Sequence, residues 1–240
     1  MSIGSVIHHL GTFFVLVAFA LLIVPDVTAP SVHHLSLFRV TGKYHTVLNN
    51  GIRGTPIIDY GSFGYCIRTV PTYRSGTGIS KVPDKCFGDG VGYAPADPIN
   101  WVYSLKKKNR ISDSTAKAAA NLTKTFVLIP LATATAFVAF LLALLSSLRP
   151  SWWASILSVG VSVLTFCLSF VAFVCGIVTF TGIRLELARS RSSVQGGYGV
   201  GMWSLLTAMI CSLLGSLLIF FTCCSGRKDR QRNAQFAKAG

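Results

Sequence analysis

Cysteine is the residue type of this chain with the clearest chemistry, and its seven copies fall into two groups. Cys66 and Cys86 stand in a polar stretch rich in Gly, Pro, Arg and Lys, whereas the other five lie within or at the end of apolar stretches. A cysteine in an apolar helix behaves as a small packing residue. Two thiols in an oxidising compartment pair readily. We therefore expect a Cys66–Cys86 disulfide if this stretch faces outward, with two free thiols or a metal site as the alternatives.

A second pair of cysteines, Cys223 and Cys224, precedes a short basic segment. Cysteines beside a membrane span are candidates for S-palmitoylation, and a basic cluster favours an anionic inner leaflet. Two ordinary cysteines at the end of a span are an equally good interpretation.

Catalysis needs a nucleophile with an oriented base, paired carboxylates or a metal cluster. The polar stretch offers scattered acids without motif spacing, namely Asp59, Asp84, Asp89, Asp97 and Asp113. The sequence therefore predicts a protein that is not an enzyme and has no cofactor, no metal site and no catalytic residue.

Composition and charge spacing indicate the elements that must position these residues. The chain has 240 residues, of which 12% are charged and 51% hydrophobic, whereas a soluble domain is about 25% charged. Runs of 24, 34 and 35 uncharged residues follow Lys124, Arg149 and Arg191, and no charge precedes Asp26. Since about 20 apolar residues cross a membrane, we expect four spans, near 7–24, 126–148, 152–180 and 202–224.

These spans predict an order of segments along the chain. They are a first transmembrane helix (1–25), an extracellular loop domain (26–124), transmembrane helices at 125–148 and 151–183, a second extracellular loop (184–201), a transmembrane helix (202–224) and a basic cytoplasmic tail (225–240). The first span is either a signal anchor or a cleaved signal peptide, because Val27-Thr28-Ala29 resembles a cleavage site. We favour the anchor, since no Lys or Arg precedes the apolar stretch.

The short basic tail orients the chain, because Lys and Arg near a span prefer the cytoplasm. With four spans, both termini are then cytoplasmic and the 26–124 segment lies outside. The net charge of +14 is spread over outer and inner segments. No basic and aromatic recognition module accompanies it, so we expect no nucleic-acid partner.

Small residues recur along the third span in an unbroken alternation of three and four positions. They include Ser155, Ser158, Ser162, Thr165, Ser169, Ala172 and Gly176. Small faces let helices approach closely, and a period of 3.5 suits left-handed crossings. We therefore predict a left-handed four-helix bundle with this helix near its centre. A hydroxyl-lined groove for ions or lipid is the alternative.

The segment between the first two spans is long enough for a small domain. The sequences VHHLSLFRV and TPIIDYGSFGYCIRTV show partial alternation with β-branched and aromatic residues, which indicates a small antiparallel sheet. ISDSTAKAAANLTK predicts a helix that begins after the N-cap Ser112 and leads into the second span. The fold class expected is an α-helical membrane protein: a four-transmembrane left-handed bundle with a small extracellular antiparallel β-sheet.

The outer segment contains a Gly-x-Phe-Gly-Tyr-Cys element and a later cysteine. Gly61, Phe63, Gly64, Tyr65, Cys66 and Cys86 carry it, and GYGVGMW precedes the last span. With one span before this element and three clustered after it, the chain resembles the fungal PalI/Sur-seven tetraspan family. It is more remotely similar in architecture to claudins, although Phe and Tyr stand where claudins have Trp.

The resemblance implies a plasma-membrane protein without catalysis that organises membrane domains or assists ambient-pH and cell-wall signalling. Its partners would be the lipid bilayer and other plasma-membrane proteins, such as a signalling receptor, membrane-domain proteins or wall-synthesis components, and it could form oligomers. The short tail favours membrane organisation. A claudin-like adhesion module and a channel or lipid-transport subunit are the alternatives. His33, His34 and His45 in the outer segment could sense external acidity, since histidine titrates near neutral pH.

Overall fold

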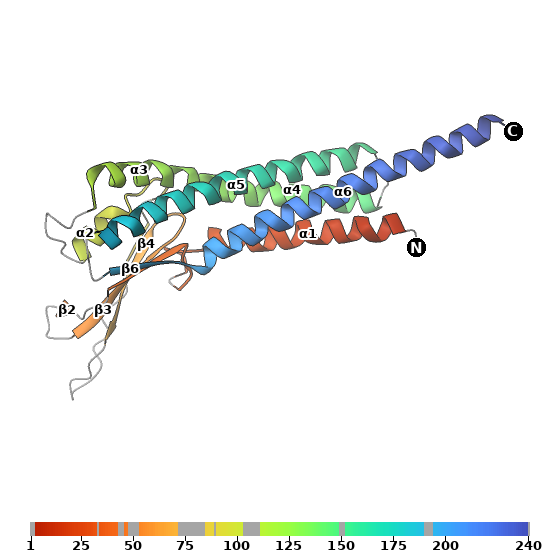
Figure 1. Ribbon diagram of the computed structural model, residues 1–240. Helices are drawn as coiled ribbons and strands as arrows, with labels where there is room; N and C mark the ends of the chain where they lie inside the picture. Colours follow the sequence, from red (N-terminus) through yellow and green to blue (C-terminus); the bar gives the residue numbers. More distant parts are fainter. Residues whose placement is uncertain are drawn as a thin grey trace. The chain divides into compact units, whose positions relative to one another are not determined.

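Helices dominate the computed structural model (Figure 1), and four of them are long and apolar enough to cross a membrane. The structure describes residues 3–32, 34–42, 46–47, 53–71, 85–88, 90–102, 111–148, 152–189 and 194–239. The four candidate spans are Val6–Asp26, Asp113–Ser147, Ser155–Arg189 and Val200–Thr222. The prediction of four spans is confirmed.

The long helices are α1 (Ile3–Asp26), α4 (Leu128–Leu148), α5 (Trp152–Arg189) and α6 (Val200–Ala239), and shorter ones are α2 (Ala96–Val102), α3 (Asp113–Thr123) and the 3-10 helix η2 (Lys124–Val127). Ser112 is the N-cap of α3 as predicted, and its side chain accepts a hydrogen bond from the Thr115 backbone N–H. The second candidate span runs without a break from α3 through η2 into α4, over 35 residues. This length exceeds the roughly 20 residues that a bilayer needs, so the helical run extends beyond the membrane.

The chain divides into two compact units. One, the helical unit, comprises Met1–Ile23, Pro130–Phe170 and Leu206–Gly240, and the other, the sheet unit, comprises Val24–Ile129 and Val171–Leu205. Each is described by itself below.

The helical unit has an apolar core in which small residues bring helices close together. The core consists of Val15, Ala139, Ala143 and Ile219, with Phe140, Val159 and Val161 packed against it. A side chain added at Gly215 of α6 would lie 2.8 Å from Val15 of α1, so these two helices are in close contact. The outward surface is apolar as well, with Phe13, Leu145, Leu157 and Phe221 each more than half exposed. Such a surface suits lipid contact, whereas the handedness of the bundle stays a prediction.

The sheet unit contains a small antiparallel sheet, as predicted. Its strands are β1 (Phe38–Gly42), β2 (Thr46–Val47), β3 (Arg53–Tyr60), β4 (Tyr65–Pro71), β5 (Lys85–Phe87) and β6 (Val194–Tyr198), in the order β5-β4-β3-β1-β6 with β2 beside β3. For the stretch 184–201 the sequence predicts only a loop, but β6 lies there and pairs with β1. The sequence of β6, VQGGY, lacks the regular alternation that marks a half-buried strand, which explains the difference.

One face of the sheet carries an aromatic row that runs across five strands. The antiparallel register aligns Tyr198, Phe38, Tyr60, Tyr65 and Phe87. Phe180 of α5 stacks on Phe38 with 4.6 Å between the ring centroids, and Tyr93 stacks on Tyr60 at 6.2 Å. Aromatic pairs at such distances contribute about 0.5–1.5 kcal/mol beyond burial, so this row holds the sheet against α5 and the segment before α2.

Candidate functional site

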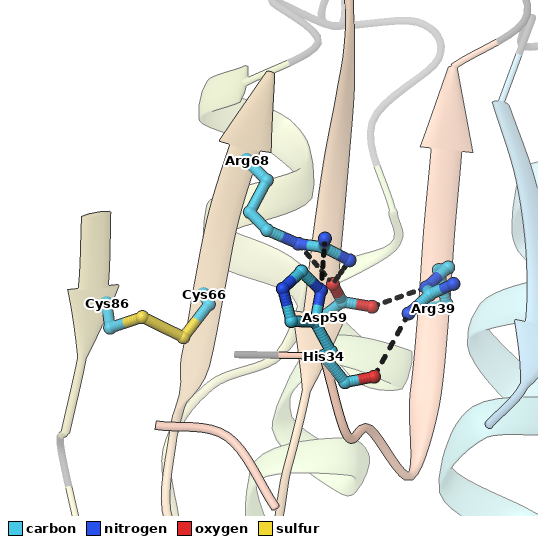
Figure 2. A network of polar contacts seen from close by, with 6 residues as sticks. All are labelled: His34, Arg39, Asp59, Cys66, Arg68 and Cys86. Atoms are coloured by element: carbon cyan, nitrogen blue, oxygen red, sulfur yellow. Dashed lines mark hydrogen bonds and ion pairs between the residues drawn. A yellow bond between two sulfur atoms is a disulfide. The ribbon is translucent and has the colours of Figure 1, made fainter. Parts of the chain in front are cut away.

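A buried carboxylate on the opposite face of the sheet holds two arginines (Figure 2). Asp59 of β3 is fully buried, and its carboxylate accepts hydrogen bonds from Nε of Arg39 at 2.5 Å and from Nε of Arg68 at 2.8 Å. Nη2 of Arg68 makes a further hydrogen bond and ion pair with the same carboxylate. A buried charge requires such partners, so the two arginines are what allow an ionised carboxylate at this position.

The strand register explains why these three residues meet. Arg39 of β1 lies directly opposite Asp59, while Arg68 of β4 lies opposite Ile57, two positions along the same face. The side chain of Arg39 is 43% exposed and that of Arg68 only 13%. Diagonal neighbours on one face of a sheet are within reach of long side chains. The carboxylate therefore links three adjacent strands, and Arg39 presents part of its charge to solvent.

His34 extends this cluster to the segment that precedes β1. Nη1 of Arg68 donates a hydrogen bond to Nδ1 of His34 at 2.9 Å, and the His34 carbonyl oxygen accepts one from Nη2 of Arg39 at 3.4 Å. A guanidinium group only donates hydrogen bonds. Nδ1 of His34 must therefore be unprotonated in this arrangement, which corresponds to the neutral tautomer with its proton on Nε2.

The disulfide predicted between Cys66 and Cys86 is confirmed, and it lies next to the charged cluster. Asp59 pairs with Cys66 across β3 and β4, and Cys66 pairs with Cys86 across β4 and β5. The two sulfurs are bonded, with 4.1 Å between the Cα atoms, and Cys66 is fully buried. Cross-linking a loop of about 20 residues contributes roughly 3 kcal/mol in the chain-entropy model. The bond therefore holds the short edge strand β5 to the sheet.

The Gly-x-Phe-Gly-Tyr-Cys element forms the turn between β3 and β4 with its first four residues, and its Tyr65 and Cys66 begin β4. The Gly61 amide donates to the Gly64 carbonyl at 2.9 Å and closes the turn. A Cβ atom at Gly61 would lie 2.0 Å from the carbonyl oxygen of Ala29, and one at Gly64 would lie 2.1 Å from that of Phe87. Backbone atoms at such distances leave no room for a side chain. Both glycines are thus required by close approaches of other segments to the turn.

Other residues bind this turn to the end of α1. Oγ of Ser62 donates to the Pro25 carbonyl at 2.7 Å, and the Ser62 amide donates to Oγ1 of Thr28 at 3.1 Å. On the other side, the Tyr93 hydroxyl donates to the Gly61 carbonyl at 2.7 Å. Burial raises the pKa of the Tyr93 phenol, so the hydroxyl stays a donor at physiological pH. The turn is therefore the junction of three segments that are distant in sequence.

The remaining motif residues also have structural contacts. The Phe63 carbonyl accepts a hydrogen bond from the Gly90 amide at 3.1 Å. The Tyr65 ring belongs to the aromatic row and stacks on Phe87 with 5.1 Å between centroids.

Most of the small residues predicted to pack the third span are buried within α5. Ser158, Ser162, Thr165 and Ser169 in the helical unit are at most 1% exposed, Ala172 is fully buried and Gly176 is buried in the sheet unit, and Ser155 is half-buried. Oγ of Ser158 donates to the Ala139 carbonyl of α4 at 3.2 Å, while a side chain at Gly176 would lie 2.9 Å from Met202 of α6. These contacts are consistent with helix packing. That these small residues serve to pack the helices stays a prediction.

Some predicted residues lie outside the described part of the chain. They are His33, His45 and the side chains of Cys223 and Cys224, so palmitoylation stays a prediction. Among the described free cysteines, Cys167 is exposed, Cys175 half-buried and Cys211 buried.

The ionic cluster is the part of the site that sequence reasoning missed. In the sequence Asp59 is one of several scattered acids, and no motif links it to Arg39 or Arg68. A single acid within the apolar strand sequence PIIDYG was the available signal, because a strand interior tolerates a charge only beside a partner. Within the described ranges, no three His, Cys, Asp or Glu side chains are grouped as a metal site would require. What the cluster can do chemically is bind strands together through charge.

Comparison with protein-family models shows what the chain is similar to. A family model described as the SUR7/PalI family matches residues 5–219. The matched range begins within α1, includes the whole sheet unit and ends within α6. A search of curated proteins finds no match for the chain.

Proposed function

Because the chain belongs to the SUR7/PalI family, we propose that it is a non-enzymatic tetraspan protein of the fungal plasma membrane that organises membrane domains. It would act through lateral contacts of its spans and through the sheet unit, with lipid and other plasma-membrane proteins as partners.

One observation supports this proposal above all: the motif residues serve to build the sheet unit. Gly61 and Gly64 leave room for the backbone of other segments to approach the turn. Tyr65 belongs to the aromatic row, and Cys66 forms the disulfide with Cys86. Motif residues with such structural roles suit a protein that acts by presenting a rigid surface to its partners. The apolar side chains on the outside of the helical unit suit contact with lipid.

We also propose that the sheet unit faces the cell exterior and that both termini are cytoplasmic. The disulfide supports the outward side, because such bonds persist in oxidising compartments. The basic tail supports the inward side for the C-terminus. Protease protection of tagged termini in sealed spheroplasts tests this topology: a tag on either end that is digested from outside would contradict it.

Imaging of a fluorescent fusion in fungal cells tests the role in membrane domains. The fusion should gather in stable patches at the cell surface, and proximity labelling from the same fusion should mark other patch proteins. A Cys66→Ser/Cys86→Ser variant should lose the patches, because the edge of the sheet is released, whereas Cys167→Ser should retain them. Uniform surface fluorescence of the unsubstituted protein would contradict the proposal.

A second candidate function, assistance to ambient-pH signalling, is favoured by the contact of His34. Protonation of Nδ1 would remove the acceptor for Arg68 and place a third cation beside Arg39 and the single carboxylate of Asp59. Acid would then loosen the segment before β1. A His34→Gln variant retains a neutral acceptor and cannot protonate. If cells with this variant respond to external pH as before, this second function fails.

A further inference from the structure

We propose that four apolar side chains around the β3–β4 turn form a patch that enters the bilayer at the boundary between lipid headgroups and acyl chains. The interfacial patch consists of Val27, Val32, Phe87 and Val91, which are 37%, 38%, 36% and 43% exposed. Each thus leaves more than a third of its surface uncovered within the sheet unit. The occupant we assign is lipid.

The turn brings together the two backbone segments that carry these side chains. Ala29 approaches Gly61 and Phe87 approaches Gly64 so closely that neither glycine could carry a side chain. The Gly90 amide is bonded to the Phe63 carbonyl, which holds the segment of Val91 to the same turn. The Cβ position of Gly88 is 3.4 Å from Cγ of Pro30, so the two segments also touch each other.

The position of the patch along the chain indicates lipid as the occupant. Val27 directly follows Asp26, the last residue of the first candidate span, and Ser62 of the turn is bonded to Pro25 within that span. The fourth span begins close to Val27, because a Cβ atom added at Gly201 would lie 3.0 Å from Cγ2 of Thr28. Apolar side chains that adjoin the ends of two candidate spans in the chain suit the zone where acyl chains meet headgroups.

Two residues near the patch have the chemistry of a membrane boundary. Trp203, in the first turn of the fourth span, is 59% exposed, and Trp is enriched where bilayer and water meet. The aliphatic stem of Lys124 lies against Gly92: a Cβ atom added at Gly92 would lie 2.7 Å from Cγ of Lys124. Lysine characteristically lays its stem on apolar surface and keeps its amine among polar groups. The inference does not depend on which side of the membrane the sheet unit faces, so it and the proposed function can fail separately.

Photo-crosslinking in native membranes tests the patch. Benzoylphenylalanine replaces Val91 in the full chain, Val32 in a second variant, and Gln195 in a matched control that is exposed on β6. After irradiation, mass spectrometry of the purified protein should find phospholipid adducts at positions 91 and 32 at several-fold the yield at position 195. A non-reducing gel that detects the Cys66–Cys86 bond verifies the fold of each variant.

The unsubstituted chain provides a second measurement that carries no folding risk. In nanodiscs of phosphatidylcholine with a diazirine near the carbonyl end of one acyl chain, light should label Phe87 and Val91 well above Gln195. In the benzoylphenylalanine experiment, adducts mainly to protein, whether a second copy or another chain, would overturn the assignment to lipid. Equal labelling of the patch and Gln195 would overturn it as well, because the patch would then face water.

Discussion

Replacing Asp59 with Asn should loosen the sheet more than removal of either arginine. The carboxylate of Asp59 is the anion that contacts both guanidinium groups of the cluster, and it is fully buried. Asn keeps the size and one oxygen acceptor but loses the charge and directs an amide donor toward cations. Both Arg39 and Arg68 are then left beside a group that no longer neutralises them.

The expected magnitudes follow from the exposure of each partner. Breaking a buried ion pair by removing one member costs about 3–5 kcal/mol. Arg39 and Arg68 are 43% and 13% exposed and can regain some water, so Asp59→Asn should fall near the lower end, about 3 kcal/mol. Arg39→Ala removes the more exposed of the two cations and leaves Asp59 paired with Arg68, so it should cost at most about 1 kcal/mol. Arg68→Ala should lie between these values.

Hydrogen-exchange mass spectrometry of the protein in nanodiscs measures this order through the opening of β1 and β3. Since 1.4 kcal/mol corresponds to a factor of ten, Asp59→Asn should speed exchange of these strands about 100-fold. Arg39→Ala should speed it by about fivefold or less. Asp97→Asn, which changes an exposed acid of α2, is the matched control and should leave the strands unaffected.

Two results would refute the reasoning. If Arg39→Ala and Asp59→Asn accelerate exchange equally, the carboxylate does not serve both arginines. If Asp59→Asn leaves exchange unchanged, the cluster contributes nothing to the cohesion of the sheet.

Three other predictions concern the turn and the helices. Gly64→Ala forces the new Cβ against the Phe87 carbonyl 2.1 Å away, whereas Gly197→Ala meets nothing within 4 Å; on non-reducing gels the first variant should lose much of its disulfide and the second none. Because burial raises the pKa of Tyr93, its neutral form stabilises the fold below the ordinary phenol value near 10, and stability should fall as pH rises above that value. Tyr93→Phe should flatten this fall in thermal melts between pH 8 and 11, at the cost of about 1 kcal/mol for the lost hydrogen bond. Ser162 is buried and, among the described residues, its hydroxyl has no partner, so Ser162→Ala should leave the melting temperature in detergent unchanged or higher, while Ser162→Leu should lower it by overpacking.

The spans and the main strands could be predicted because their signals are local. A charge-free run, an alternation of apolar residues and the N-cap at Ser112 can each be recognised from neighbouring residues alone. The Cys66–Cys86 bond was also within reach, because the compartment of a loop restricts the chemistry of its thiols.

The Arg39–Asp59–Arg68 cluster could not be predicted in the same way, because it depends on strand register. A shift of one residue between β1 and β3 would turn Asp59 to the opposite face from its partner. The strand β6 was missed for a related reason. Its sequence, with two adjacent glycines, shows no alternation of apolar and polar residues. It forms a strand because it pairs with the edge of β1 that β3 leaves free.

The pairing of β1 with β6 also sets an order of events during synthesis. Phe38 emerges from the ribosome soon after the first span, but its partner Tyr198 follows only after two further spans have been made. Until then the edge of β1 lacks the strand that will cover it, so the sheet cannot be completed while the chain is still short. A chain released before β6 would display that bare edge, and unpaired strand edges readily pair with other chains.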